Sequence, residues 1–188
     1  LLGHDMEPNR VYNEYATTAH EIDNIGKEIV NLKKNNKVAI LYSHDSYFGL
    51  QFMPYTSGDN YPVVQLHSLL YRNNIETDIV PCDKMTDFSR YQMLIIPPLY
   101  VASDSLLQKI SDFVKNGGEV VMMCKSGYCD ENSAVRPMKA PGPLRKACGF
   151  YYQEHSSIKN MNLKENLFGI KDNAVSTWTE FLIPETAK

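Results

Sequence analysis

The chain has no long apolar run, since its longest stretches, such as Met93 to Leu99, are far too short to span a bilayer. It also has no run of basic residues longer than the Lys33-Lys34 pair, and its 19 basic and 22 acidic side chains give a formal net charge of -3. Nucleic acids and anionic membranes are bound by concentrated basic surfaces. The sequence therefore argues against a membrane span, and against nucleic acid or membrane as a partner.

The chain has few cysteines, and their spacing matches no metal-binding or redox motif. The four cysteines stand at 82, 124, 129 and 148, without a Cys-x-x-Cys pair and without the histidine spacing that closes a zinc site. The chain opens with Leu1-Leu2-Gly3 and shows no charged-then-apolar signal segment. We therefore expect no metal site, and the unpaired thiols favour a reduced, cytoplasmic location.

Phosphate-binding motifs are also missing. The segment after the first predicted strand, Ser43 to Gly49, lacks the Gly-x-Gly-x-x-Gly of a dinucleotide site and the Gly-Lys-Ser/Thr of a P-loop. It also lacks the dense Ser, Thr and Gly composition expected around a flavin phosphate. No cofactor is therefore expected.

A long amphipathic helix is the clearest feature that is present. Apolar residues step by three or four positions along one stripe: Val11, Tyr15, Ala19, Ile22, Ile25, Ile29 and Leu32. Pro8 suits the first turn of such a helix, and the Asn35-Asn36 pair suits its end. The helix is expected to occupy most of the segment before residue 37.

Short apolar runs alternate with helical segments in the rest of the chain. The predicted strands are 37–42, 77–80, 91–96, 119–124, 150–153 and 176–183, and the predicted helical segments are 61–72, 103–115 and 144–147. Strands separated by helices of this size form right-handed βαβ units and a mainly parallel sheet. The expected fold is a doubly wound α/β domain of the flavodoxin-like kind, an architecture that class I glutamine amidotransferases share.

Catalytic groups are sparse. Cys124 follows a predicted strand, as the amidotransferase nucleophile does, but Met123 stands where a glycine is needed and no His-x-Glu pair lies downstream. Adjacent residues of an extended chain point to opposite faces, so Asp130 and Glu131 are poorly placed as a glycosidase pair. We interpret Cys124 as a buried thiol at a strand end, with a divergent glutaminase-like hydrolase as the alternative.

Aromatic residues gather after the first predicted strand. The segment from residue 47 to residue 61 contains Tyr47, Phe48, Phe52, Tyr55 and Tyr61. Such a cluster docks onto another domain or subunit, where aromatic side chains supply much of the interface energy. Stacking on sugar rings, as in a carbohydrate-binding module, is the alternative.

The stretch from Ser126 to Arg145, with its Ser-Gly, Asp-Glu-Asn and Pro-Gly-Pro-Leu series, resembles the middle domain of glycoside hydrolase family 42 β-galactosidases. Three further segments fall in the same order. Gly3-His4-Asp5 resembles the exit from that family's catalytic barrel, residues 113–121 its helix-to-strand step, and residues 178–187 a later strand. The resemblance covers essentially the whole chain.

The resemblance implies a non-catalytic domain that joins three subunits of a retaining β-galactosidase. Residues 1–36 would be the exit from an upstream catalytic barrel with a connecting helix, and residues 37–188 the amidotransferase-like trimerisation domain, truncated at its C-terminus. Neither catalytic glutamate motif of the family matches a position here. The family's first loop is often rich in tryptophan, where this chain has Tyr47 and Phe48. The expected contact residues are Tyr47, Phe48, Phe52, Tyr55, Asp130, Glu131, Arg136 and Pro141.

Overall fold

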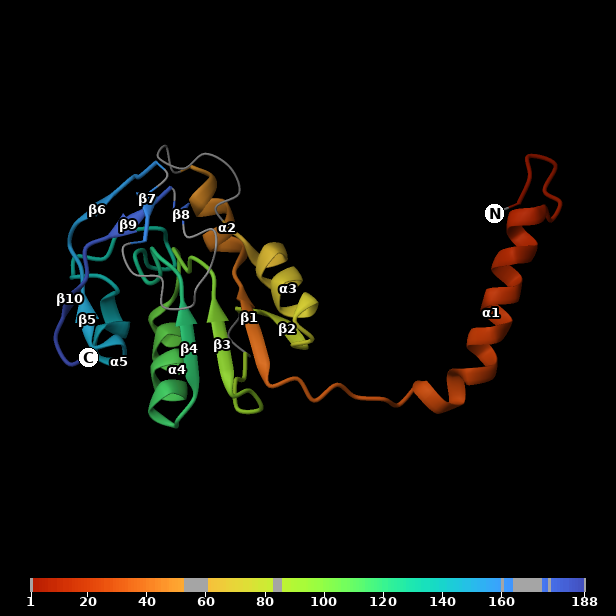
Figure 1. Ribbon diagram of the computed structural model, residues 1–188, viewed down its shortest axis with the longest axis horizontal. Coiled ribbons are helices and arrows are strands. Elements are labelled where there is room, and N and C mark those ends of the chain that lie inside the picture. The colour runs from red at the N-terminus through yellow and green to blue at the C-terminus, as the bar shows by residue number, and fades with distance from the viewer. Residues whose placement is uncertain are drawn as a thin grey trace. The chain divides into compact units, whose positions relative to one another are not determined.

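The computed structural model describes residues 2–52, 61–82, 86–159, 161–163, 174–175 and 177–187 (Figure 1). Its chain divides into two compact units, residues 1–35 and residues 36–188. No helix in the described part of the chain combines the length and apolar character needed to cross a membrane. The two units are taken in turn.

Helix α1, Arg10–Ile29, makes up most of the first unit. Its start is fixed by Asn9, whose side-chain oxygen accepts the backbone N–H of Tyr12 at 3.0 Å. Pro8 therefore precedes the cap instead of standing in the first turn, and the helix ends before Leu32, so both expected ends were a few residues off. None of its 20 residues is buried, and its apolar stripe is exposed along the whole helix.

The second unit is built on a four-stranded parallel sheet with the order β2-β1-β3-β4. The strands are β1 Val38–Tyr42, β2 Thr77–Pro81, β3 Met93–Ile96 and β4 Glu119–Met122. The four apolar runs of the sequence thus form strands, and the expectation of an α/β fold with a parallel sheet is confirmed.

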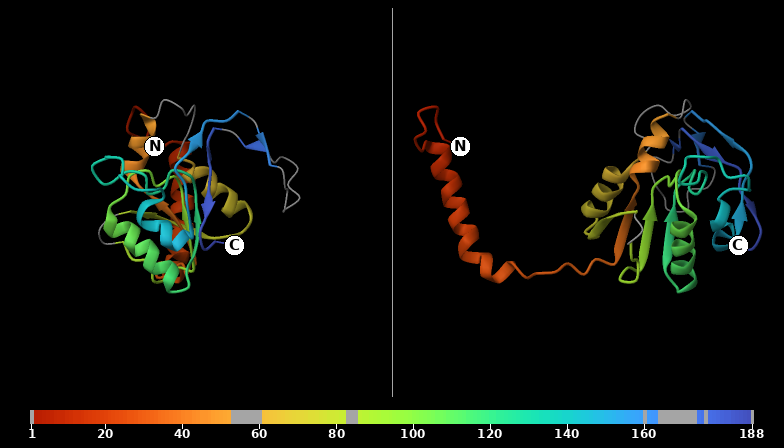
Figure 2. Two further views of the ribbon diagram at one scale, coloured as in Figure 1. Left: turned by 90° about the vertical axis from the view of Figure 1, so that its left-hand side faces the viewer. Right: turned by 180° about the vertical axis from the view of Figure 1, so that it is seen from behind.

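Helices cover both faces of this sheet (Figure 2). Their bounds are α2 His44–Gln51, α3 Val63–Arg72, α4 Asp104–Lys115, the 3-10 helix η1 Gly142–Leu144, and α5 Arg145–Cys148. Alternate residues of β1 face opposite sides, as a period of two requires. Ala39 and Leu41 join the core under α4, and Ile40 joins the core that Leu50 and Val63 complete.

No helix is predicted between residues 43 and 60, yet α2 forms there. Ser43 caps it, because its hydroxyl oxygen accepts the N–H of Ser46 at 3.1 Å. Ser46 is itself fully buried, and its hydroxyl bonds to the backbone C=O and N–H of Val101. A helix that buries a serine in this way gives no apolar repeat, so the apolar pattern could not reveal it.

The strand expected at 150–153 does not extend the parallel sheet. Helix α5 has four residues and rises only about 6 Å, too little to carry the chain back along a strand. The residues form β5, Phe150–Tyr151, which pairs antiparallel with β10, Ile183–Pro184. The strand expected at 176–183 is likewise divided, because β9, Thr179–Glu180, pairs with β6, His155–Ser156. A third short pair joins β7, Met161–Asn162, to β8, Ala174–Val175.

Candidate interface surfaces

The aromatic cluster has an inner and an outer part. Tyr61 is buried, and its hydroxyl oxygen accepts the N–H of Ser43 at 2.5 Å. The ring of Tyr47 packs edge-on against the rings of Tyr61 and Phe48, at centroid distances of 6.0 and 5.3 Å. Burial raises the pKa of Tyr61 well above its usual range. Tyr47 and Tyr61 therefore belong largely to the domain's own core.

The outer part of the cluster is Phe48 and Phe52, with side chains that are 54% and 86% exposed. Phe48 stacks on His44 at 6.3 Å, and Phe52 caps the C-terminus of α2. Tyr55, also expected at a contact, lies outside the described residues. The exposed apolar area of this cluster therefore lies toward the C-terminal end of α2.

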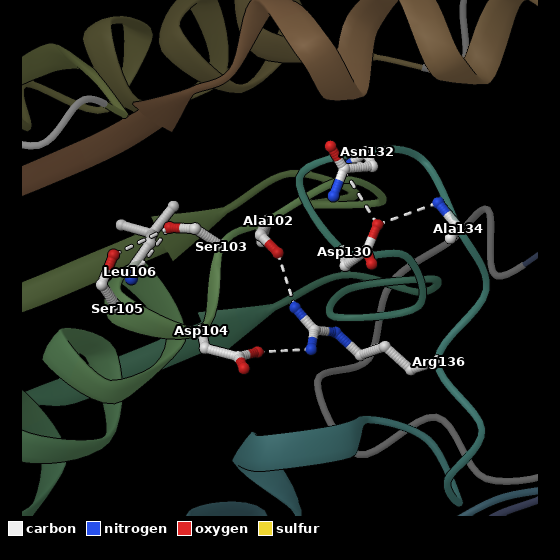
Figure 3. Close-up of polar contacts among 9 residues, drawn as sticks. All are labelled: Ala102, Ser103, Asp104, Ser105, Leu106, Asp130, Asn132, Ala134 and Arg136. Atoms are coloured by element: carbon white, nitrogen blue, oxygen red, sulfur yellow. Dashed lines mark hydrogen bonds and ion pairs between the residues drawn. The ribbon is translucent and has the colours of Figure 1, made fainter.

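The Asp-Glu-Asn motif forms a tight, internally bonded turn (Figure 3). One carboxylate oxygen of Asp130 accepts the N–H groups of Asn132 and Ala134, each at 2.9 Å, and its backbone C=O accepts the N–H of Ser133. Glu131 is exposed at the corner of the turn. The two neighbouring carboxylates thus have different roles: Asp130 fixes the turn, and Glu131 is presented outward.

Arg136 anchors this loop to the start of α4 (Figure 3). Its side chain is only 7% exposed, forms an ion pair with Asp104, and donates to the C=O of Ala102 at 2.6 Å. Its Nε–H is buried and has no hydrogen-bond partner among the described residues. Most of the guanidinium is therefore engaged within the chain.

Pro141 supports the same loop from inside. It is fully buried after a cis peptide bond from Ala140. Gly127 packs against it so closely that a β-carbon there would lie 2.7 Å from the Pro141 carbonyl oxygen, and the φ of Gly127 is +71°. Only glycine meets both demands at little cost. Arg136 and Pro141 thus hold the loop in place, while Glu131 lies on its outside.

The turn after β4 carries Cys124 and Lys125. Burial, and next the negative charge of Glu180, raise the pKa of the Cys124 thiol to about 11. A cysteine nucleophile needs the opposite shift, because the thiolate is the reactive form. Cys124 is therefore a protonated, half-buried thiol at neutral pH, which argues against the glutaminase-like alternative.

Lys125 holds the strained position of that turn, with φ at +59°. Its backbone N–H donates to the Glu180 carboxylate at 2.7 Å, and its ammonium lies 3.7 Å from the centre of the Trp178 ring. The ring of Trp178 also stacks on His155, with ring centroids 4.5 Å apart. Residues from the C-terminal segment therefore cover the end of β4.

This group of residues could not be predicted from the sequence. Lys125 contacts positions more than 50 residues away, and a backbone with positive φ at a lysine leaves no trace in composition or periodicity. Among the residues that the structure describes, no three His, Cys, Asp or Glu side chains converge to hold a metal ion.

Comparison with known proteins decides the family. The model of the β-galactosidase trimerisation domain matches residues 36–188. This chain belongs to that family. The match begins at the residue where the second compact unit begins, so α1 lies outside it.

Curated relatives extend the likeness over the whole chain. The β-galactosidase BgaA of Clostridium cellulovorans is 29% identical over 195 residues, and the β-galactosidase LacZ of Lactobacillus acidophilus is 29% identical over 192. The crystal structure of the β-galactosidase from Bacillus circulans sp. alkalophilus is 25% identical, with a TM-score of 0.83 over the full chain and 29% of its own. The chain spans 28% of the length of these two curated relatives. The resemblance seen in the sequence is confirmed, and neither alternative function is favoured.

Proposed function

We propose that this chain is the non-catalytic part of a β-galactosidase through which three subunits assemble. The family match over residues 36–188 is the observation that carries the proposal. The raised pKa of Cys124, the only nucleophile candidate of the sequence, supports a domain without chemistry of its own. The parent protein would be a retaining hydrolase of terminal β-galactosides, as the names of the relatives suggest.

We further propose that residues 1–36 are the exit from an upstream catalytic barrel together with a connecting helix, and that the assembly domain is 37–188. The exposed stripe of α1 supports this division. An apolar side chain such as Ile22 or Ile25 gains roughly 1.5–3 kcal/mol when it is fully buried. A surface of the barrel is the partner that we propose for this stripe.

The amidotransferase-like, flavodoxin-like assignment of the fold is part of the proposal. The parallel order β2-β1-β3-β4 supports it, because flavodoxin-like sheets have this order. Ligands of such sheets bind at the carboxyl ends of the strands. Trp178 and Glu180 cover the end of β4, where an amidotransferase would have its nucleophile. The domain would thus use this fold as a scaffold for assembly.

A cytoplasmic location is proposed from the thiols. None of the four cysteines forms a disulfide: Cys129 is buried, and Cys82, Cys124 and Cys148 are half-buried. Proteins of oxidising compartments more often pair their cysteines, whereas cytosolic proteins keep them reduced. The absence of any disulfide among these four residues supports the reducing compartment.

Subunit contacts are proposed at the outer aromatic residues Phe48 and Phe52, with Tyr55 beside them in sequence, and at the Asp130–Pro143 loop. Large exposed aromatic rings dominate many protein interfaces. Replacing Phe48 and Phe52 together by serine should raise the concentration at which the full-length trimer dissociates by at least about tenfold, as measured by sedimentation velocity.

The matched control is Tyr71→Ser on α3. Tyr71 is 71% exposed, so this substitution removes a comparably exposed ring from a surface where no contact is proposed. Equal dissociation of the double variant, the control and the unaltered protein would refute the proposed contact at α2.

A further inference from the structure

A cavity of about 410 Å³ lies beside the Asp130–Pro143 loop. Its walls come from residues 127–128, from 135–140 and from the segment around β6, and they include Arg136, Lys139 and His155. No aspartate or glutamate is among the described residues that line it. The lining therefore offers positive charge and hydrogen-bond donors without a carboxylate of its own.

One donor at this cavity has no acceptor within the described chain, the buried Nε–H of Arg136. The hydroxyl of Tyr152 lies close to the Glu180 carboxylate, and its pKa is raised first by burial and then by the charge of Glu180. A buried donor without an acceptor is unfavourable, so it marks a place where an acceptor is expected. Asp104 offsets the charge of Arg136. The ammonium of Lys139 instead contacts an aromatic ring, and lies 4.0 Å from the centre of Tyr151. The cavity is thus suited to a carboxylate.

An exposed carboxylate stands on the other side of the same loop. Glu131 borders a separate crevice of about 120 Å³ with Ser103 and Lys109, and does not line the cationic cavity. The bonds that Asp130 makes within the turn hold Glu131 at its corner. The loop therefore presents an acidic tip on one side and a cationic cavity on the other.

A ring of three identical subunits needs this kind of asymmetry. Rotation by one third of a turn brings one surface of a subunit against a different surface of the next, so that each subunit must carry two complementary surfaces. A twofold contact would instead bring each surface against its own copy. An acidic tip and a cationic cavity on one loop meet the requirement of a closed ring.

We propose that Glu131 of one subunit enters the cationic cavity of the next and pairs there with Lys139. The inference rests on the proposed trimerisation and names the contact that sets its geometry. Charge complementarity identifies the occupant as a second copy of the chain. Opposite charges across an interface also fix the register of the partners.

A charge-swap series on the full-length protein tests this contact. The changes Glu131→Lys and Lys139→Glu should each raise the midpoint concentration of trimer dissociation about tenfold or more, because each brings like charges together. Combining the two should recover most of the lost association. Because Lys139→Glu also disturbs the contact with Tyr151, the neutral pair Glu131→Gln and Lys139→Gln repeats the test with milder changes.

Lys146→Glu is the control, since Lys146 is exposed on α5 and does not line the cavity. It should leave the midpoint unchanged. If the unaltered protein trimerises and the single variants have the same midpoint concentration of dissociation, the Glu131 contact is refuted while trimerisation stands. If the single variants weaken the trimer and the swap recovers nothing, the pairing is refuted as well. A monomeric unaltered protein would instead refute the proposed function.

Discussion

Helices α4 and α1 carry the same kind of apolar stripe, but α4 buries it within its own unit and α1 does not. Leu107 and Ile110 of α4 are 0% and 1% exposed, whereas Ile22 and Ile25 of α1 are 55% and 53% exposed. Both helices begin at a side-chain cap, Ser103 for α4 and Asn9 for α1. The local signals that form a helix are therefore separate from the contacts that hold it, and the stripe of α1 is available to a surface outside its own unit.

The sharpest test of this comparison is a pair of matched substitutions. Ile110→Ala should lower the free energy of unfolding by about 3 kcal/mol, since it leaves a cavity under the sheet. Ile22→Ala in the same chain should lower it by less than about 0.5 kcal/mol, because the side chain is already exposed. Urea unfolding followed by circular dichroism measures both.

In a longer protein that carries the upstream barrel, the losses of unfolding free energy caused by Ile110→Ala and Ile22→Ala should become similar. Ile22→Ala should then cost about 2 kcal/mol or more, because the stripe of α1 would be buried. A cost that stays below about 0.5 kcal/mol there would contradict the proposed packing of α1.

The next effect concerns the loop that Arg136 anchors. Arg136→Ala should lower the free energy of unfolding by about 2 kcal/mol, because it removes a nearly buried guanidinium from Asp104 and from the C=O of Ala102. Arg90→Ala, which removes a far more exposed guanidinium from Asp78, should lower it clearly less. Equal losses in urea unfolding would show that the anchor adds nothing beyond a surface ion pair.

The sequence predicts those parts of the fold that depend on local patterns, and not those that depend on long-range contacts. The sheet, α1 and α4 follow from apolar periodicity and from residues such as Ser103, whose hydroxyl accepts the N–H of Leu106. Helix α2 could not be predicted from apolar periodicity, because Ser46 is buried by hydrogen bonds rather than by apolar contact. The anchoring by Arg136 and the cover of Trp178 over Lys125 depend on long-range contacts that a local pattern does not encode.

The smallest effect of a single side chain is the pH dependence that two thiols give to the sheet unit. The folded pKa values of Cys124 and Cys148 are both raised to about 11, mainly by burial, against about 9 for an exposed thiol. Their contribution is complete below pH 9. It is lost as pH rises through 11, because the unfolded chain ionises first. Stability should fall by about 1–2 kcal/mol per thiol over this interval.

Replacing both cysteines by alanine should reduce this fall in urea unfolding, whereas the part caused by buried tyrosines such as Tyr61, whose pKa is also raised, should remain. Cys129→Ala alone shows how much a further buried thiol with a raised pKa contributes. A profile with the same fall after the double replacement would mean that other groups cause it.

Assembly is the central claim, and the mass of the full-length protein in solution tests it most directly. Light scattering coupled to size-exclusion chromatography, over a hundredfold dilution, should give three times the mass of one chain at the higher concentrations. A mass of one chain at every concentration would contradict the account.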